Sequence, residues 1–470
     1  MNYFWVSIDK FGNVILKTIG IIIIARILSP ENFGVFSVAS TFIAFANVIV
    51  DSGLGGALIK KQDANEKDFS TVFIFNLTLS IVLYIFICLF SKNISEYFNI
   101  VELNSVIPLI SLLLIIKSLS LIQITYLTKE LKFKVQAKIS FISYLISFVF
   151  GYYFACNGFG VFSLVYMSLI EAIILLTLYT YVGKVFPKLY FSLSSFKEMY
   201  SFGFFLMLSS ILKTAYENAL SLILTKNFGA VQSGYYYQAN RVNQIFVNTV
   251  TTIINKAAFP IIVKSINDNN KSFLEMQKVC RFSCAVCFFI FAIISVYSQT
   301  IISILFGEKW IKSAPMLSII ILSGYGMIVE SLTRSYLKSY GKASLIFKLE
   351  VLKRSLGLSL IVFCLQYDLK VILWAYVIST IMSALINIYT TTNNVPYKTR
   401  ILLYDIGLPL FTSLVVLFLG NYIVSNFIFF SSLIGMFFYT TVSFITSFTI
   451  LFFVGYFGFS NSFIRHFKRS

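Results

Sequence analysis

Long apolar segments recur along almost the whole chain, and they constrain the possible folds more than any other feature of the sequence. A helix of about 18 or more mainly apolar residues is long enough to cross the hydrocarbon core of a bilayer. No hydrophilic stretch between the segments is long enough for a separate soluble domain, so the sequence predicts an all-α membrane protein. About fourteen transmembrane helices are predicted, at residues 11–28, 33–55, 70–90, 106–128, 139–156, 160–182, 201–225, 235–263, 282–305, 314–337, 345–365, 371–391, 402–424 and 430–456.

The composition indicates that lipid is the main solvent and argues against several classes of enzyme. Hydrophobic residues make up 58% of the chain and charged residues only 12%, about half the charged fraction of an average soluble domain. The sequence contains no Walker A phosphate loop and no serine-nucleophile elbow. Cys280, Cys284 and Cys287 share one helix face, but the only histidine, His466, lies in the basic tail. We therefore expect a transporter without a metal or cofactor, not an enzyme.

Lysine and arginine are distributed unevenly between alternate loops, and this predicts the orientation of the chain. Cytoplasmic loops of membrane proteins carry an excess of these residues. Here they concentrate in the two termini and the even-numbered loops, whereas the odd-numbered loops hold only Lys92, Lys226, Lys309, Lys312 and Lys370. Both termini are therefore predicted to be cytoplasmic. The net charge of +18 follows from this topology and from attraction to anionic lipid head groups, without nucleic-acid binding.

Short motifs occur twice in the chain, in the same order. Gly34-Val-Phe opens the second predicted span and Gly234-Tyr-Tyr opens the eighth, a shift of 200 residues. Other matched pairs are Lys60 and Lys264, Pro108 and Pro315, and Tyr126 and Tyr336. The shift grows slowly along the chain, as a duplication with small insertions would produce.

The duplication predicts how the spans are grouped. Residues 1–190 would form an N-lobe with spans 1 to 6, and residues 191–397 a C-lobe with spans 7 to 12. Residues 398–470 would add spans 13 and 14 and a basic cytoplasmic tail. Six spans is an even number, so the two repeats enter the membrane from the same side. Two such lobes can face each other across a central cleft and give alternating access by rocking.

Many ionisable residues lie inside the predicted spans, where each is expensive. A charge at the bilayer centre costs at least ~2.5 kcal/mol on insertion scales, so it should face a partner or water. The basic residues are Lys17, Arg26, Lys117, Lys213, Arg241, Lys256, Arg334, Lys353 and Arg354, and the acidic ones are Asp51, Glu171, Glu217, Glu330 and Glu350. Basic residues outnumber acidic ones, so internal pairing cannot neutralise them all.

These residues give two predicted sets of site residues. Polar side chains on span 8 form a stripe along one helix face, which lipid cannot solvate. We predict a cationic cleft that binds an anionic substrate, a phosphate especially, through Lys17, Arg26, Lys117, Lys213, Asn240, Arg241, Gln244, Asn248 and Lys256. The candidates for ion coupling are Asp51, Glu171, Glu217, Glu330 and Arg334.

A purely structural role remains open for part of both sets. Polar residues in membrane helices often hold neighbouring helices together. Lys213 with Glu217, and Glu330 with Arg334, are spaced as ordinary ion pairs one helical turn apart. Lys17, Lys117 and Arg241 have no evident partner nearby in the sequence, which favours the cleft for those three.

Several motifs resemble a known family. The segment Ala25-Arg-Ile-Leu-Ser-Pro-Glu-Asn-Phe-Gly34, followed by Asp51-Ser-Gly-Leu-Gly55, resembles the N-terminal signature of Wzx-type polysaccharide flippases. These belong to the multidrug/oligosaccharidyl-lipid/polysaccharide exporter superfamily. The likeness continues through Phe306-Gly-Glu-Lys-Trp310 and covers residues 20 to 345. The chain looks most similar to the fourteen-span, colanic-acid-type exporters, a group akin to the O-antigen flippases of lipopolysaccharide synthesis.

The resemblance implies a fold, a substrate and an energy source. The fold would be a V-shaped pair of six-helix lobes in the bacterial cytoplasmic (inner) membrane. The substrate would be an undecaprenyl-pyrophosphate-linked oligosaccharide repeat unit, flipped to the outer leaflet, with membrane lipids and polysaccharide-assembly proteins as further partners. A proton or sodium gradient would drive the cycle. The family supplies no invariant site motif, so the site residues above rest on the residue pattern alone.

Two other functions compete with a flippase. A drug exporter of the same fold would need an acidic cleft for cationic drugs, whereas the charges here are mainly basic. A membrane-embedded polysaccharide polymerase or glycosyltransferase would need a large outer loop with catalytic residues, and the predicted outer loops are short.

Overall fold

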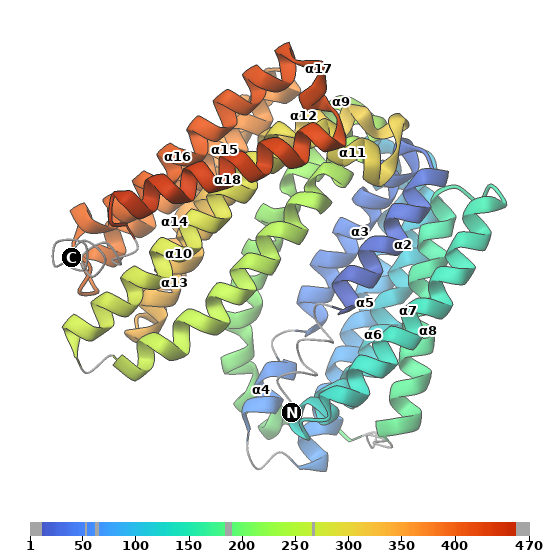
Figure 1. Ribbon diagram of the computed structural model, residues 1–470. Coiled ribbons are helices and arrows are strands. Elements are labelled where there is room, and N and C mark those ends of the chain that lie inside the picture. The colour runs from blue at the N-terminus through green and yellow to red at the C-terminus, as the bar shows by residue number, and fades with distance from the viewer. Residues whose placement is uncertain (1–11, 52–53, 62–64, 184–189, 266–267, 457–470) are drawn as a thin grey trace. The chain divides into compact units, whose positions relative to one another are not determined.

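The computed structural model describes residues 12–51, 54–61, 65–183, 190–265 and 268–456, and in these residues the chain is helical without β-strands (Figure 1). In chain order, the described helices are α2 (Asn13–Ile27), α3 (Pro30–Asp51), α4 (Leu54–Lys60), α5 (Glu66–Phe98), α6 (Leu103–Lys129), α7 (Phe133–Cys156), α8 (Val161–Gly183), α9 (Leu193–Ser265), α10 (Asn269–Val296), α11 (Ser298–Phe306), α12 (Ala314–Ile320), α13 (Ser323–Ser339), α14 (Ala343–Phe363), α15 (Leu369–Thr392), α16 (Thr399–Asn426), α17 (Ile428–Ser431) and α18 (Leu433–Phe453). Short 3₁₀ helices lie at Glu308–Ser313 and Cys364–Gln366.

Nine helices in the described part of the chain are long and apolar enough to cross a membrane, and a tenth span forms if the bent pair Glu308–Ile320 and Ser323–Ser339 counts as one. The chain is therefore a multi-pass membrane protein. Helices also cover the other predicted spans, but α2 has only 15 residues and α14 carries four charged residues in its centre. The total of fourteen spans stays a prediction.

Predicted spans 7 and 8 lie in α9, which has 73 residues and a break at Gly229. Gly229 has φ 82° and ψ 171°, in the region of positive φ that glycine adopts without steric strain. The break lies between the two predicted spans. Glycine therefore provides the turn here that separate loop residues provide elsewhere.

Contacts divide the chain into two compact units, residues 1–237 (unit 1) and 238–470 (unit 2). The division falls within α9, whereas the predicted lobes divide at residue 190. Compact units follow packing and lobes follow the sequence repeat, so the two boundaries need not coincide. The assignment of lobes and the six-span repeat stay predictions.

Unit 1 is built around α6, which packs against α3, α5 and α8, while α7 packs on α8 and α2 (Figure 1). Buried Val38, Ile107 and Val165 belong to its main apolar core. This packing places α2, α3, α6 and α8 around a common space.

Gly34 of α3 and Gly234 of α9 form a close helix crossing within unit 1. A Cβ at Gly34 would overlap the carbonyl oxygen of Ala230, and a Cβ at Gly234 would overlap the carbonyl oxygen of Pro30. The shift of 200 residues that relates Gly34 to Gly234 also relates Pro30 to Ala230, so the two contacts are reciprocal. Small residues allow helix backbones to approach this closely. The repetition of this glycine motif in predicted spans 2 and 8 thus has a steric reason.

A polar clamp attaches the start of α9 to α5 in unit 1. The Lys61 ammonium lies 2.8 Å from the Glu198 carboxylate and 3.2 Å from that of Asp68. The hydrogen bond to Glu198 raises the pKa of Lys61 above its usual value. Asp68 also closes a capping box with Asn65 at the start of α5. The clamp fixes where α9 begins.

In unit 2, the predicted C-terminal part is tied to α10 by a buried carboxylate. Asp405 of α16 is fully buried and accepts hydrogen bonds from Arg281 at 2.6 Å, Tyr397 at 2.7 Å and Gln277 at 2.9 Å. Arg281 also donates to the carbonyl oxygen of Tyr456. The predicted appendage is therefore anchored to the preceding helices of unit 2 by a charge and a hydrogen-bond network.

Candidate functional site

A cavity of ≈ 940 Å³ lies within unit 1, and four of the predicted site residues line it. They are Lys17 of α2, Asp51 of α3, Lys117 of α6 and Glu171 of α8. Although far apart in sequence, these side chains converge because α6 packs between α3 and α8. The charged lining thus consists of two lysines and two carboxylates.

Lys17 and Glu171 form an ion pair in this cavity, with 2.6 Å between Nζ and Oε1. The Lys17 side chain is 43% exposed and that of Glu171 is 18% exposed, so the pair stays open to the hollow. Tyr144 of α7 supports the position of α2, because its hydroxyl donates to the Lys17 carbonyl oxygen at 3.2 Å. The Lys17 ammonium also lies 5.6 Å from the centre of the Tyr144 ring.

Lys117 and Asp51 extend the charged lining. Lys117 lies midway along α6, yet its side chain is accessible because it borders the hollow. Within the described residues, its ammonium has no carboxylate at ion-pair distance. Asp51 is the last residue of α3 and is likewise exposed toward the cavity. A lysine in a membrane-spanning helix that faces a wet hollow without a fixed counter-charge can bind an anion.

Neutral polar side chains complete the wall of the cavity. Asn47, Ser118, Ser120, Thr125, Ser168 and Ser210 belong to this group. Ser120 donates to the Lys117 carbonyl oxygen at 3.0 Å, and Ser168 donates to the Leu164 carbonyl oxygen at 2.8 Å. Their protons are used within their own helices, so the remaining lone pairs can accept hydrogen bonds from water or from sugar hydroxyls.

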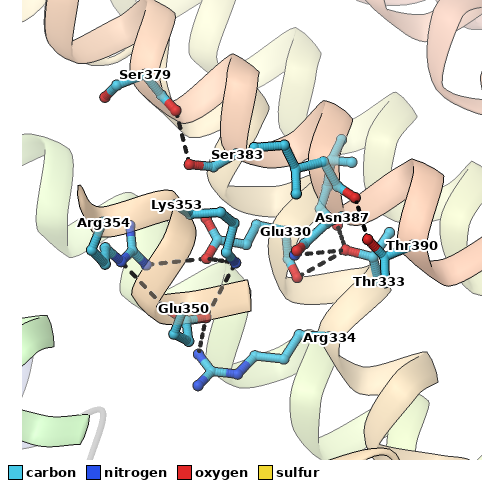
Figure 2. A network of polar contacts seen from close by, with 12 residues as sticks. Glu330, Thr333, Arg334, Glu350, Lys353, Arg354, Ser379, Ser383, Asn387 and Thr390 are labelled. Atoms are coloured by element: carbon cyan, nitrogen blue, oxygen red, sulfur yellow. Dashed lines mark hydrogen bonds and ion pairs between the residues drawn. The ribbon is translucent and has the colours of Figure 1, made fainter. Parts of the chain in front are cut away.

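Unit 2 holds a second charged group, shown in Figure 2, that is much more enclosed. Lys353 donates to Glu330 at 2.8 Å and to Glu350 at 3.2 Å. Arg354 lies 3.1 Å from Glu330 and 3.3 Å from Glu350, and Arg334 reaches Glu350 at 3.5 Å. The Lys353 side chain is 1% exposed and that of Glu330 is 8% exposed. We call these five residues the unit 2 network.

The unit 2 network corrects one expected pairing. Glu330 and Arg334 were candidates for an ion pair one turn apart, but Glu330 binds Lys353 and Arg354 while Arg334 turns to Glu350. Both acceptors for Arg354 and Lys353 come from α13 and α14, which pack together. The sequence contains a signal for this network, because four charged residues lie within two turns of α14: Lys348, Glu350, Lys353 and Arg354.

Of the other predicted site residues in unit 1, Arg26, Lys213 and Glu217 are not among those that line the cavity. Lys213 and Glu217 form the expected pair on α9, at 3.7 Å, with both side chains exposed. Arg26 lies in the last turn of α2. Unit 2 contains Asn240, Arg241, Gln244 and Asn248 on α9, where Asn248 donates to Gln244 at 3.0 Å. The side chain of Lys256 lies outside the described residues.

The sequence did not indicate which lysine meets which carboxylate. Lys17 and Glu171 are 154 residues apart, and only the packing of α2 and α8 around the same cavity brings them together. Among the described residues, His, Cys, Asp and Glu side chains form no group of three or more suited to a metal ion. Cys280, Cys284 and Cys287 are buried in α10.

Comparison with known proteins gives matches in sequence and in fold. The profile of the family described as polysaccharide biosynthesis protein matches residues 23–315. Teichuronic acid biosynthesis protein TuaB of Bacillus subtilis (strain 168) is 26% identical over 81% of this chain and 80% of its own length. Lipopolysaccharide biosynthesis protein WzxC of Escherichia coli (strain K12) is 25% identical over 75% of this chain and 73% of its own length.

The solved structures that match share the fold at low sequence identity. The lipid II flippase MurJ in an inward closed conformation has a TM-score of 0.77 and 15% identity, covering 95% of this chain and 98% of that one. An inward-facing multidrug resistance MATE family transporter of the MOP superfamily has a TM-score of 0.59 and 14% identity, covering 86% and 99%. The resemblance to Wzx-type flippases is confirmed, as is the prediction of a transport protein rather than an enzyme. This multi-pass membrane protein belongs to the polysaccharide biosynthesis protein family.

Proposed function

We propose that this protein flips an undecaprenyl-pyrophosphate-linked oligosaccharide repeat unit from the cytoplasmic to the outer leaflet of the bacterial cytoplasmic membrane. The names of the relatives support a role in surface polysaccharide synthesis, and the MurJ-like fold supports a lipid-linked sugar as the cargo. In this proposal both termini are cytoplasmic, as the distribution of lysine and arginine predicts. Two lobes would alternate between openings on the two sides.

The observation that carries the proposal is the pair of lysines in the unit 1 cavity. A pyrophosphate carries about two negative charges, and moving it through a medium of low dielectric without partners would cost several kcal/mol or more. Lys17 and Lys117 line the same hollow of ≈ 940 Å³ between the helices of unit 1. Their ammonium groups would lower the cost for the head group, while the prenyl tail remains in lipid throughout.

The cavity also contains groups that suit coupling to an ion gradient. Asp51 and Glu171 line it together with the lysines. A carboxylate that faces a hollow open to one side of the membrane at a time can take up a proton or a sodium ion on one side and release it on the other. In our proposal these two carboxylates link glycan export to ion entry. Glu217 and Glu330 would then have structural roles in their ion pairs.

The function is tested in cells that lack the protein. Lipid-linked repeat units should accumulate on the cytoplasmic side, and mass spectrometry of the extracted lipids should identify their sugars. Wild-type protein should restore export, and the double variant Lys17→Gln with Lys117→Gln should not. Lys92→Gln is a matched control, because Lys92 is 78% exposed and has only a 3.9 Å pair with Glu96.

Each result separates the proposal from its rivals. Normal surface polysaccharide in the deletion strain, together with new sensitivity to cationic drugs, would indicate a drug exporter of the same fold. Full export by the double lysine variant at normal protein level would refute the lysine site but not the flippase. Normal export by Lys92→Gln is required for either reading, because it shows that loss of one lysine does not itself disturb insertion.

A further inference from the structure

We propose that Glu171 takes the place of the substrate's phosphate in the empty cavity and is displaced from Lys17 when an anionic substrate binds. This inference rests on the proposed function, because it assigns a role to a carboxylate in the same site. It concerns selectivity and release, which the proposed binding of pyrophosphate by lysine does not address. Glu171 is then a positioning residue that acts on the substrate through Lys17.

The first argument is that the Lys17–Glu171 pair is close but not sealed. Its 2.6 Å separation is that of a strong charge-assisted hydrogen bond. Lys17 remains 43% exposed, so a ligand in the cavity can approach the ammonium while the pair is still formed. The Lys353–Glu330 pair of unit 2 is also short, at 2.8 Å, but its lysine is only 1% exposed. Exchange of partners is therefore possible at Lys17 and blocked at Lys353.

The second argument comes from the charges. While Glu171 holds Lys17, Lys117 is the only lysine of the cavity that has no carboxylate at ion-pair distance in the described structure. One available ammonium cannot balance the two charges of a pyrophosphate. When Glu171 withdraws from Lys17, both ammonium groups can face the two charges of the pyrophosphate. The exchange thus favours an anion with two charges over one with a single charge.

This selectivity has a use in a membrane full of phospholipids. A zwitterionic lipid head group carries one phosphate with its own attached cation, so it gains little from Lys117 and too little from Lys17 to displace Glu171. A prenyl pyrophosphate gains from both lysines. The pair would therefore keep bulk phospholipid from being flipped. A specific transporter needs such a way to reject wrong ligands as well as to bind the right one.

The same carboxylate would promote release on the outer side. After the cavity opens outward, Glu171 competes with the pyrophosphate for Lys17 and restores the empty pair. Removal of its charge should therefore tighten substrate binding and slow release at once. A merely structural Glu171 would give the opposite result for binding, because disturbing the cavity would weaken it.

The test measures binding of farnesyl pyrophosphate, a short prenyl pyrophosphate, to the full-length protein in nanodiscs by calorimetry. Glu171→Gln should bind it roughly five- to tenfold more tightly than wild type, an effect on the order of 1 kcal/mol. Asp51→Asn is the matched control, because Asp51 lines the same cavity without an ion pair to Lys17 in the described structure, and its effect should be smaller. In a flipping assay with proteoliposomes, Glu171→Gln should lower both KM and kcat.

A second variant guards against failure to fold. In Glu171→Asp the carboxylate ends one methylene short of Lys17, so the affinity should lie between those of wild type and Glu171→Gln. If the wild-type protein binds farnesyl pyrophosphate and neither Glu171 variant binds it more tightly, the inference is overturned. The proposed function is left intact by that result. Absence of binding in wild type, together with normal flipping of a lipid-linked sugar, would overturn the lysine site on which the inference depends.

Discussion

The charged groups of the two units use the same kinds of residue but differ in how much water reaches them. In the unit 1 cavity, Lys17 is 43% exposed and pairs with Glu171. In the unit 2 network, Lys353 is 1% exposed and lies between Glu330 and Glu350 (Figure 2). A lysine that borders a hollow can exchange partners, whereas an enclosed lysine cannot. The comparison therefore supports the proposed transport role of the first group and a structural role for the second.

The difference follows from where the partners come from. Glu350 and Lys353 are one turn apart on α14, and Glu330 comes from α13, which packs on it. Neighbouring helices thus complete the unit 2 network before any ligand is needed. In unit 1 the partners come from α2 and α8, which face each other across a cavity of ≈ 940 Å³. Space between the helices, more than the identity of the charges, separates a binding site from a structural network.

The largest expected effect breaks the unit 2 network at its most buried pair. Glu330→Gln removes an acceptor of both Lys353 and Arg354 and leaves a buried ammonium incompletely paired. Loss of one partner of a buried pair costs about 3–5 kcal/mol. We expect a large fall in the temperature of unfolding in detergent, measured by intrinsic fluorescence. Glu96→Gln is the control, because the exposed Lys92–Glu96 pair should contribute less than about 1 kcal/mol.

The next prediction tests whether unit 2 needs its charges or only their mutual balance. Glu330→Gln combined with Lys353→Met removes both members of the buried pair, and Arg354 keeps its contact with Glu350. Replacing a whole buried ion pair is often close to neutral, so the double variant should recover most of the stability that Glu330→Gln loses. A double variant less stable than Glu330→Gln would contradict this account. Normal glycan export by the double variant would further exclude ion coupling at Glu330.

Unit 1 should respond in the opposite way, with a loss of transport and little change in stability. Lys117→Gln removes a cation that has no carboxylate at ion-pair distance in the described structure, so the temperature of unfolding should stay the same or rise slightly. Flipping of the lipid-linked glycan should fall at least about tenfold, because one of the two ammonium groups is lost. Both quantities are measured on the same purified protein. A fall in stability without a fall in flipping would reverse the roles assigned to the two units.

Sequence reasoning predicted the helical membrane fold but not how the charges are paired. Apolar content and length are local properties, so they located the nine described helices that are long and apolar enough to cross a membrane. The pairing of Lys17 with Glu171 depends on the packing of helices that are 154 residues apart. The expected partner of Glu330, Arg334, satisfied the helical spacing, but α14 supplies stronger partners in Lys353 and Arg354. Helical spacing identifies pairs that can form, and packing decides which of them do.

The smallest expected effect concerns Arg334, the one member of the unit 2 network that resembles a unit 1 lysine. Its side chain is 47% exposed and its distance to Glu350 is 3.5 Å, longer than the contacts of Lys353. An exposed pair of this kind contributes about 0–1 kcal/mol. Arg334→Gln should therefore change the unfolding temperature little, and Arg334→Lys should change it still less. If exposure alone made a charge functional, Arg334→Gln would reduce flipping as strongly as Lys117→Gln. We expect a much smaller reduction, because Glu350 also neutralises Arg334, and comparison of the two variants in one proteoliposome assay measures how far the cavity itself matters.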